Sequence, residues 1–329
     1  MKGIRWFLKS ALTCSAFAVV AVHAGAGDAQ NGYPNNMERA VHAFTNAVRL
    51  APEQYRDKYL GVTGILLPAT YPAVGPLYFD LALAQVARGH SIDMGDNCGM
   101  QHNSCDGTTF ANRLKAVYPS AAMGENIAVS QKNGFLVVKA WLLDNVGGVV
   151  APDASGNDGH RQNIMSSSYK ELGVGFYNGM ATGKLRTYWT QDFGSKTADV
   201  YPIPSGAFDE IVSGTFTFLA SYYDGAGNAP KASKIVLNSV VTDLTLELGT
   251  AAKGTYMLNV PKGNGCMNYY FLFTDAGGKE WRYPETTTLS TVDGVVCDES
   301  ASSIIRTGIK KAQGPLKLRY FDLLGRSEN

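Results

Sequence analysis

The sequence predicts an α+β protein in which a region of helices with a few strands precedes an antiparallel β-sandwich. Two observations support this prediction. Apolar residues recur at helical spacing in several stretches before residue 200, whereas strict alternation of apolar and polar residues dominates after residue 207. Between the two regions, residues 199–206 carry the Pro and Gly residues that are typical of a linker. The 329 residues are enough for two domains of ordinary size.

Composition narrows the class of protein further. Hydrophobic residues make up 45% of the chain and charged residues 17%, which is typical of a globular protein rather than a disordered one. The net charge is +1 and the charged residues are dispersed along the chain. A nucleic-acid-binding protein usually carries a basic stripe, so we expect no nucleic-acid partner.

The first 24 residues have the pattern of a secretory signal peptide. Lys2, Arg5 and Lys9 precede the apolar stretch ALTCSAFAVVAVHAGA, and cleavage is expected after Ala24, with positions 25–27 as close competitors. The alternative is a membrane anchor, but the apolar run is shorter than the ~20 residues that a span needs. No later segment is long and apolar enough to span a membrane. We therefore expect a secreted, periplasmic or cell-surface protein.

Four cysteines remain once residues 1–24, which include Cys14, are removed. They are Cys98, Cys105, Cys266 and Cys297. Four cysteines in an exported chain suggest two disulfides, for which three connectivities are possible. The pairs Cys98–Cys105 and Cys266–Cys297 are favoured because each lies within one candidate domain. Free thiols remain an alternative if the compartment is reducing.

The first helix is predicted over residues 37–50. It follows residues 25–36, which are small and polar and are expected to form a flexible lead-in. Asn36 is placed to cap the helix. Its apolar residues at helical spacing are Met37, Val41, Phe44 and Val48.

Three more helices and two strands are predicted before the linker. The helical stretches are LALAQVARGHSIDM after Asp80, TTFANRLKAVYP up to Pro119, and FLVVKAWLLDNVGG up to Gly147 and Gly148. The strand-like stretches are ELGVGFY and RTYWTQDFG. Helices interleaved with strands in this way are typical of a layered α/β arrangement.

The C-terminal region, residues 207–329, alternates with period two and is broken by turn sequences such as DGAGN and DAGGK. This pattern predicts an antiparallel β-sandwich in which PLKLRYFDL supplies a last edge strand. Its aromatic residues are better explained by core packing than by a sugar-binding platform. The alternating apolar sets are Phe216 and Phe218; Leu244, Leu246 and Leu248; Tyr256, Leu258 and Val260; and Tyr269, Phe271 and Phe273.

Histidines are few, so their contexts are informative. His42 lies within the first predicted helix and His90 at the end of the second, where a structural or surface role is the simpler explanation. His102 and His160 instead lie in loop-like stretches rich in Gly, Asn and Asp. Binding and catalytic residues concentrate in such loops, so these two histidines are the candidates for a functional site.

Two carboxylates are candidates beside them. Glu125 lies in MGENIAV, where a helix-capping role is the alternative. Asp144 lies three residues after Trp141, in the last turn of a predicted helix, where the helix dipole disfavours an anion by up to about 1 kcal/mol. It therefore needs a cation, a proton or a metal nearby, unless it is simply a surface residue. The gaps between His102, Glu125, Asp144 and His160 form no local ligand motif.

Four short stretches together resemble the CAP superfamily of cysteine-rich secretory, antigen 5 and pathogenesis-related proteins, also called SCP-domain proteins. They are GENIA at 124–128, GHRQNIM at 159–165, LGVGF at 172–176 and YWTQDFG at 188–194. The resemblance implies a three-layer α-β-α sandwich with a large cleft. It places a CAP domain at 37–198, a linker at 199–206 and an immunoglobulin-like β-sandwich at 207–329.

The resemblance also implies a cleft that carries two histidines and two acidic residues. His102, Glu125 and His160 match three of these positions, and the two histidines would bind zinc or another divalent cation. Asp144 stands where the family usually has glutamate, so its reach is one methylene shorter. The segment 145–157 looks longer than in compact bacterial relatives and is expected to reshape the rim of the cleft.

Three functions are compatible with these residues. The first is an exported module that binds an unknown ligand, a lipid or an extracellular protein in the cleft. The second is a metal-assisted hydrolase with Glu125 or Asp144 as general base. The third is a structural extracellular protein with no ligand. The resembled family has no single shared reaction, and the chain contains neither G-x-S-x-G nor HExxH, which favours the first function.

Overall fold

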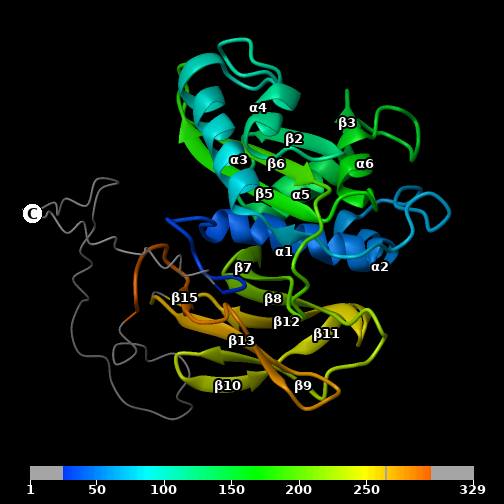
Figure 1. Cartoon of the computed structure of the whole chain (residues 1–329), viewed down its shortest axis with the longest axis vertical. Helices are drawn as coiled ribbons and strands as arrows, with labels where there is room; N and C mark the ends of the chain where they lie inside the picture. The colour runs from blue at the N-terminus through cyan, green and yellow to red at the C-terminus, as the bar shows by residue number, and fades with distance from the viewer. Residues whose placement is uncertain (1–24, 264, 298–329) are drawn as a thin grey trace, which may run out of the picture.

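The computed structural model describes residues 25–263 and 265–297 and shows an α+β protein (Figure 1). A three-layer α-β-α sandwich is followed by an antiparallel β-sandwich, as the sequence predicted. The expected signal peptide at 1–24 and the expected edge strand PLKLRYFDL lie outside the described residues. Within the described ranges, no helix combines the length and apolar character needed to cross a membrane.

The central sheet of the first region has the strand order β1-β5-β6-β2. β1 pairs with β5 in parallel, and the other neighbours are antiparallel. Its strands are β1 (Tyr78–Phe79), β2 (Met123–Val129), β5 (Glu171–Gly179) and β6 (Arg186–Gly194). The helices around it are α1 (Asn36–Leu50), α3 (Leu81–Asp93), α4 (Phe110–Val117), α5 (Gly134–Leu143) and α6 (Gly159–Met165).

Strand β5 shows why the stretch LGVGF suits this layering. Leu172 and Val174 point into the core that contains α1 and α5. Gly173 and Gly175 point to the opposite face, where α3 lies directly on the sheet. A Cβ atom at Gly173 would come within 2.1 Å of the Leu83 backbone, and one at Gly175 within 2.2 Å of the Ala87 backbone. Only glycine allows this close approach of helix and strand.

Helix α1 begins with a different cap from the one expected. Asn35, rather than Asn36, is the N-cap: its side chain accepts a hydrogen bond from the Glu38 backbone N–H, and the Glu38 carboxylate accepts one from the Asn35 backbone N–H. This reciprocal capping box requires the glutamate three residues after the cap, which selects Asn35. Asn36 is the first residue of the helix itself.

The β-sandwich consists of two antiparallel sheets with the orders β11-β12-β8-β7 and β10-β9-β13-β14, and β15 pairs with β13. Aromatic side chains from both sheets, including Phe218, Tyr269 and Phe271, fill the space between them. The strands are β7 (Ser205–Val212), β8 (Thr215–Tyr223), β9 (Ala232–Leu237), β10 (Val240–Asp243), β11 (Thr245–Thr250), β12 (Lys253–Pro261), β13 (Asn268–Thr274), β14 (Glu280–Tyr283) and β15 (Leu289–Ser290).

The two regions share a core along α1. Figure 1 shows this helix, in blue, between the central sheet and the β-sandwich. Ala207, Leu219, Leu248 and Met257 from the sheet β11-β12-β8-β7 are buried in the same cluster as Val48 of α1. Because one sheet covers each side of it, nearly the whole of α1 is buried.

One predicted alternation does not keep to a single face. Leu244 packs in the core of the β-sandwich, but Leu248 packs on the opposite side with α1. Leu246 between them is 38% exposed. The pairing of β11 with β12 is irregular between Leu246 and Leu248, and such a bulge moves the following side chains to the other face.

The prediction that residues 25–36 form a flexible lead-in is wrong. Asp28 is buried and accepts hydrogen bonds from Thr286 and Thr287, and Ala26 exchanges hydrogen bonds with Glu285. These bonds attach the segment to the β-sandwich. The expected linker at 199–206 also differs, because its last two residues already belong to β7 and Ile203 is buried in the sandwich core.

Short elements complete the described chain. Helix α2 (Pro52–Tyr55) continues into the π-helical turn η1 (Arg56–Leu60), and α3 continues into the π-helical turn η2 (Met94–Cys98). The segment after α5 forms a small hairpin of β3 (Asn145–Val146) and β4 (Val149–Val150). This hairpin opens the segment 145–157, which was expected to shape the cleft rim.

Candidate functional site

A cleft of about 670 Å³ brings together all four residues that the sequence singled out. His102 comes from the loop between η2 and α4, and Glu125 from β2. Asp144 comes from the end of α5, and His160 from the first turn of α6. Its lining residues are Met100, His102, Glu125, Asn126, Ile127, Ala128, Val129, Ala140, Trp141, Asp144, Asn145, Gly156, Asn157, Gly159, His160, Gln162 and Asn163.

His102 and Glu125 form the first histidine–carboxylate pair. The Nδ1 atom of His102 lies 2.9 Å from Oε1 of Glu125, and Arg113 donates a hydrogen bond to Oε2 of the same carboxylate. The Glu125 side chain is 1% exposed, whereas the His102 side chain is 52% exposed. Glu125 therefore lies inside a strand beneath the imidazole, and the alternative interpretation of it as a helix cap is wrong.

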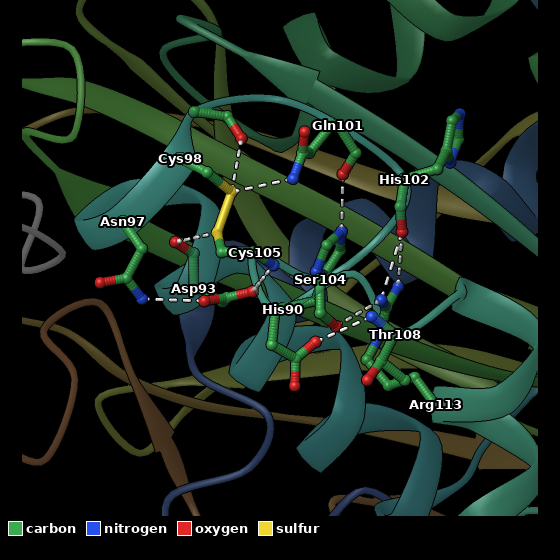
Figure 2. Close-up of a disulfide and its surroundings, with 12 residues drawn as sticks. His90, Asp93, Asn97, Cys98, Gln101, His102, Ser104, Cys105, Thr108 and Arg113 are labelled. Atoms are coloured by element: carbon green, nitrogen blue, oxygen red, sulfur yellow. Dashed lines mark hydrogen bonds between the residues drawn. A yellow bond between two sulfur atoms is a disulfide. The ribbon is translucent and has the colours of Figure 1, made fainter.

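The loop that carries His102 is held at both ends. A disulfide joins Cys98 to Cys105 across it, with Cα atoms 5.6 Å apart (Figure 2). Arg113 of α4 donates hydrogen bonds of 3.2 Å to the His102 carbonyl oxygen and of 3.0 Å to Ser104 Oγ. The second disulfide joins Cys266 to Cys297 in the β-sandwich. These are the two pairings that the sequence favoured.

His160 and Asp144 form the second pair. Asp144 is the C-cap of α5 in the left-handed conformation, with φ 44°, and its Oδ1 atom contacts Nδ1 of His160. Its Oδ2 atom accepts a hydrogen bond of 3.1 Å from the backbone N–H of Arg161. An anion at a helix C-terminus is disfavoured by the dipole. The imidazole and this backbone N–H, at the start of α6, supply the compensating partners.

The guanidinium of Arg161 binds the segment 145–157, which forms part of the rim of the cleft. It is buried and donates to the carbonyl oxygens of Leu142 (2.5 Å) and Ala151 (2.6 Å), and it lies 2.9 Å from Asp153. These contacts hold the segment 145–157 against the end of α5. Asn145, Gly156 and Asn157 from that segment line the cleft, so it forms part of the rim.

Hydrogen bonds among the lining residues connect α6 to β2. Asn163 donates to the Glu125 carbonyl oxygen at 3.2 Å and to Asn126 Oδ1 at 2.9 Å. Gln162 donates to Asp158 at 2.7 Å, beside the first residue of α6. The polar residues that open α6 therefore orient the helix that presents His160.

Three side chains that were not predicted to belong to the site lie near Glu125: Arg113, Asp192 and His90, the last of which was expected to have a structural or surface role. Arg113 binds the Glu125 carboxylate, and His90 lies 4.0 Å from Oε2 with its pKa lowered, chiefly by burial. Asp192 of β6 pairs in register with Glu125, and burial together with the neighbouring Glu125 raises the pKa of its carboxyl well above the usual range. The available signal was the aspartate within YWTQDFG, a stretch that was already predicted to be a strand.

His42 has the structural role that was expected for it. It is buried in α1, and its Nε2 atom lies 2.8 Å from the Leu77 carbonyl oxygen. Burial lowers the pKa of His42 to about 4, so the imidazole is neutral and donates that hydrogen bond. It does not line the cleft.

The donor atoms in the cleft suit an open cation site better than a closed one. A carboxylate contacts Nδ1 of each cleft histidine, and within the described part of the chain neither His102 nor His160 has a hydrogen-bond partner at Nε2. This is the usual arrangement of metal-binding imidazoles. A closed zinc site needs four protein ligands. Among the described residues, the one trio of His, Cys, Asp or Glu with ligand atoms within 4.8 Å of one another is Asp93, Cys98 and Cys105, whose cysteines form the disulfide.

Comparison with known families agrees with this geometry. Residues 25–193 match the model of the cysteine-rich secretory protein family, CAP. The chain belongs to the CAP family. The match spans the central sheet, its helices and all four cleft residues, and ends before the β-sandwich.

Curated relatives resemble the CAP domain over part of their length. The uncharacterized protein YkwD of Bacillus subtilis is 33% identical over 119 residues, which are 36% of this chain and 39% of the relative. The uncharacterized membrane protein YlbC of the same organism is 32% identical over 118 residues, which are 36% of this chain and 28% of the relative. This chain therefore spans less than two fifths of either relative.

Solved structures give matches of similar extent. An extracellular SCP-domain protein from Bacillus anthracis is 31% identical and covers 37% of this chain and 35% of its own, with a TM-score of 0.29. An outer surface protein from Borrelia burgdorferi is 22% identical and covers 38% of this chain and 80% of its own, also with a TM-score of 0.29.

Proposed function

We propose that this CAP-domain protein is an exported binding module whose cleft holds a divalent cation, zinc or a similar ion, through His102 and His160. The observation that carries the proposal is the shared state of the two imidazoles. In each, Nδ1 contacts a buried carboxylate and Nε2 has no hydrogen-bond partner among the described residues, and both histidines line one cleft. Imidazoles oriented in this way present Nε2 to a ligand.

The carboxylates favour binding over hydrolysis. A general base must be free to accept a proton from the attacking water. Glu125 is already engaged by His102 and Arg113, and Asp144 by His160 and the backbone of Arg161. A bound divalent cation would supply positive charge for a carbonyl or anionic group of the ligand. The protein's own contribution is to fix the imidazoles and shape the rim with residues 145–157.

The proposed location is outside the cytoplasm, in a secreted, periplasmic or surface-attached state. Two disulfides in one chain are typical of oxidising compartments. The pattern of residues 1–24 points the same way, because it has the charged start and apolar run of a secretory signal.

Calorimetric titration of zinc into the chain from residue 25 onwards tests the cation site. We expect one-to-one binding that is lost in the double variant His102→Ala/His160→Ala. Asn157→Ala is the matched control, because Asn157 lines the same cleft but offers neither an imidazole nor a carboxylate. Absence of zinc binding in the wild type, or binding that survives the double substitution, would refute the proposal.

The hydrolase alternative is separated by a second measurement on the same proteins. Zinc-loaded wild type would be mixed with an activated ester such as 4-nitrophenyl acetate. We expect no turnover above that of Glu125→Gln with zinc. Turnover that needs both histidines and Glu125 would instead assign the cleft to metal-assisted hydrolysis.

A further inference from the structure

Arg113 contacts both partners of the first histidine–carboxylate pair. Its guanidinium donates two hydrogen bonds of 3.2 Å to the carbonyl oxygen of His102 and another to the Glu125 carboxylate. It also donates to Ser104 Oγ at 3.0 Å, two residues along the same loop. Figure 2 shows the fork of Arg113 reaching from α4 to the loop that carries His102.

The charge environment makes this arginine necessary. The Glu125 side chain is almost wholly buried and lies in register with buried Asp192. A buried carboxylate needs a paired positive charge, and removal of that partner is strongly unfavourable. His90 is a poor substitute, because burial lowers its pKa and it lies 4.0 Å away. Arg113 is therefore the permanent cation beside Glu125.

The contact with the Glu125 side chain determines which nitrogen of His102 carries the proton. A carboxylate only accepts hydrogen bonds, so the imidazole must present its proton on Nδ1 to make the 2.9 Å contact. The lone pair is then left on Nε2, which is the atom that a cation or a hydrogen-bond donor would use. The hydrogen bonds from Arg113 to the His102 carbonyl oxygen fix the position of the residue and therefore of its Nε2 atom.

We propose that Arg113 is a positioning residue of the cleft that sets both the place and the tautomer of His102 by holding its carbonyl and the Glu125 carboxylate together. The inference rests on the proposed function in one respect: the identity of the ligand that binds Nε2 of His102. The tautomer and the carbonyl bonds, however, belong to the metal-free protein, so they can be measured whether or not a cation binds.

The second pair provides an internal reference. Arg161 contacts Asp144 only through its backbone N–H, and its guanidinium is used on Leu142, Ala151 and Asp153 instead. The tautomer of His160 therefore depends on its contact with Asp144, and no guanidinium of the described residues binds that carboxylate. Substitution of Arg113 should leave His160 unchanged.

Arg88 provides a matched control outside the cleft. It also donates to a buried glutamate, Glu38, and to a backbone carbonyl, that of Gly32. Its side chain is 18% exposed, against 12% for Arg113. Arg88→Gln should therefore perturb the fold to a similar extent without affecting His102.

The experiment is nitrogen-15 NMR of the histidine rings in the metal-free protein at neutral pH, with the His102 signals assigned from His102→Ala. We expect His102 in the Nδ1–H form in the wild type and in Arg88→Gln, and a mixture of both tautomers in Arg113→Gln. Zinc affinity should fall about tenfold in Arg113→Gln, in the range for loss of a residue that orients a ligand. An Arg113→Gln protein that matches Arg88→Gln in tautomer and in zinc affinity would overturn the inference.

Arg113→Lys separates the effect of Arg113 on the tautomer of His102 from its effect on the position of His102. It also provides a test if Arg113→Gln does not fold. Lysine keeps the charge but lacks the planar fork that reaches two acceptors. We expect the Nδ1–H tautomer to persist while the carbonyl carbon signal of His102 shifts, because its two hydrogen bonds are lost. An unshifted carbonyl signal would overturn the positioning role. Failure of wild-type protein to bind zinc would refute the proposed function alone.

Discussion

The cleft and the α1 interface use histidine in opposite ways within one CAP domain. In α1, His42 is buried with its Nε2 atom bonded to the Leu77 carbonyl, and its pKa is lowered to about 4 by burial. In the cleft, His102 and His160 are partly exposed, each with Nδ1 on a buried carboxylate and Nε2 without a partner in the described chain. A satisfied imidazole supports the fold, whereas an oriented and unsatisfied one is available to a ligand.

Polar groups in the interface follow the same rule as His42. Asn46 of α1 donates to Ser205 of β7 and to the Leu77 carbonyl, and it accepts from the Leu77 N–H. Asp209 of β7 accepts from the Phe135 N–H at the start of α5, at 2.7 Å, while burial raises the pKa of its carboxyl to about 6. The β-sandwich therefore covers α1 and caps the start of α5. The polar groups of this interface are satisfied by residues of the same chain.

The largest expected effect is from breaking this interface. Leu219 of β8 is fully buried in the cluster that also contains α1. Leu219→Ala should lower the free energy of unfolding by about 2–5 kcal/mol, because a large side chain is lost from a closed core. Because both regions share α1, they should unfold in one transition on urea denaturation. Unfolding is monitored by tryptophan fluorescence and circular dichroism.

Val241→Ala, on the exposed edge strand β10, is the control for this prediction. Val241 is 55% exposed, so its truncation should change the free energy of unfolding by less than about 0.5 kcal/mol. A loss below about 1 kcal/mol in Leu219→Ala, or separate transitions for the two regions, would mean that the sandwich is only loosely docked on α1.

The second effect is a pH dependence of stability that comes from His42 in the α1 interface. The folded-state pKa of His42 lies near 4, below the ordinary value of 6.5, so the folded protein binds this proton less readily than the unfolded chain. Its contribution is therefore fully present above pH 6.5 and is lost as pH falls from 6.5 towards 4. The loss amounts to about 3 kcal/mol.

His42→Gln should remove that part of the pH dependence, because glutamine can still donate to the Leu77 carbonyl but does not titrate. The measurement is the free energy of unfolding of both proteins between pH 7.5 and 4.5. The difference between wild type and variant should move in favour of the variant as pH falls. Parallel pH profiles would show that His42 is not the buried neutral group described here.

Much of the fold could be predicted from the sequence because it depends on local pattern. Helical spacing located α1, α3, α4 and α5, and the strand-like stretch ELGVGFY lies in β5, against which α3 packs. His102 and His160 were selected by their loop-like contexts, and Glu125 and Asp144 as candidate carboxylates beside them. The resemblance to the CAP family placed all four in one cleft, which the structure contains. Their roles as cation ligands or as a general base stay predictions.

The contacts that the sequence could not supply are the long-range ones. Arg113 lies in the predicted helical stretch TTFANRLKAVYP, where local spacing indicates no contact with Glu125, and only the fold brings it to Glu125 in β2. Residues 25–36 looked like a free segment because the partner of Asp28, Thr286, lies 258 positions further along the chain. A bulge within β11 likewise moved Leu248 to the other core.

Among the substitutions of buried-core and cleft residues, the smallest expected effect on stability comes from the cleft. His102→Ala removes a side chain that is 52% exposed, and Glu125 keeps its hydrogen bond from Arg113. The free energy of unfolding should therefore change by less than about 1 kcal/mol, as for other half-exposed pairs. The same substitution should abolish zinc binding in the calorimetric titration, so function and stability separate at this residue. A loss of several kcal/mol would instead show that the pair is part of the structural core, and the contrast with His42 would disappear.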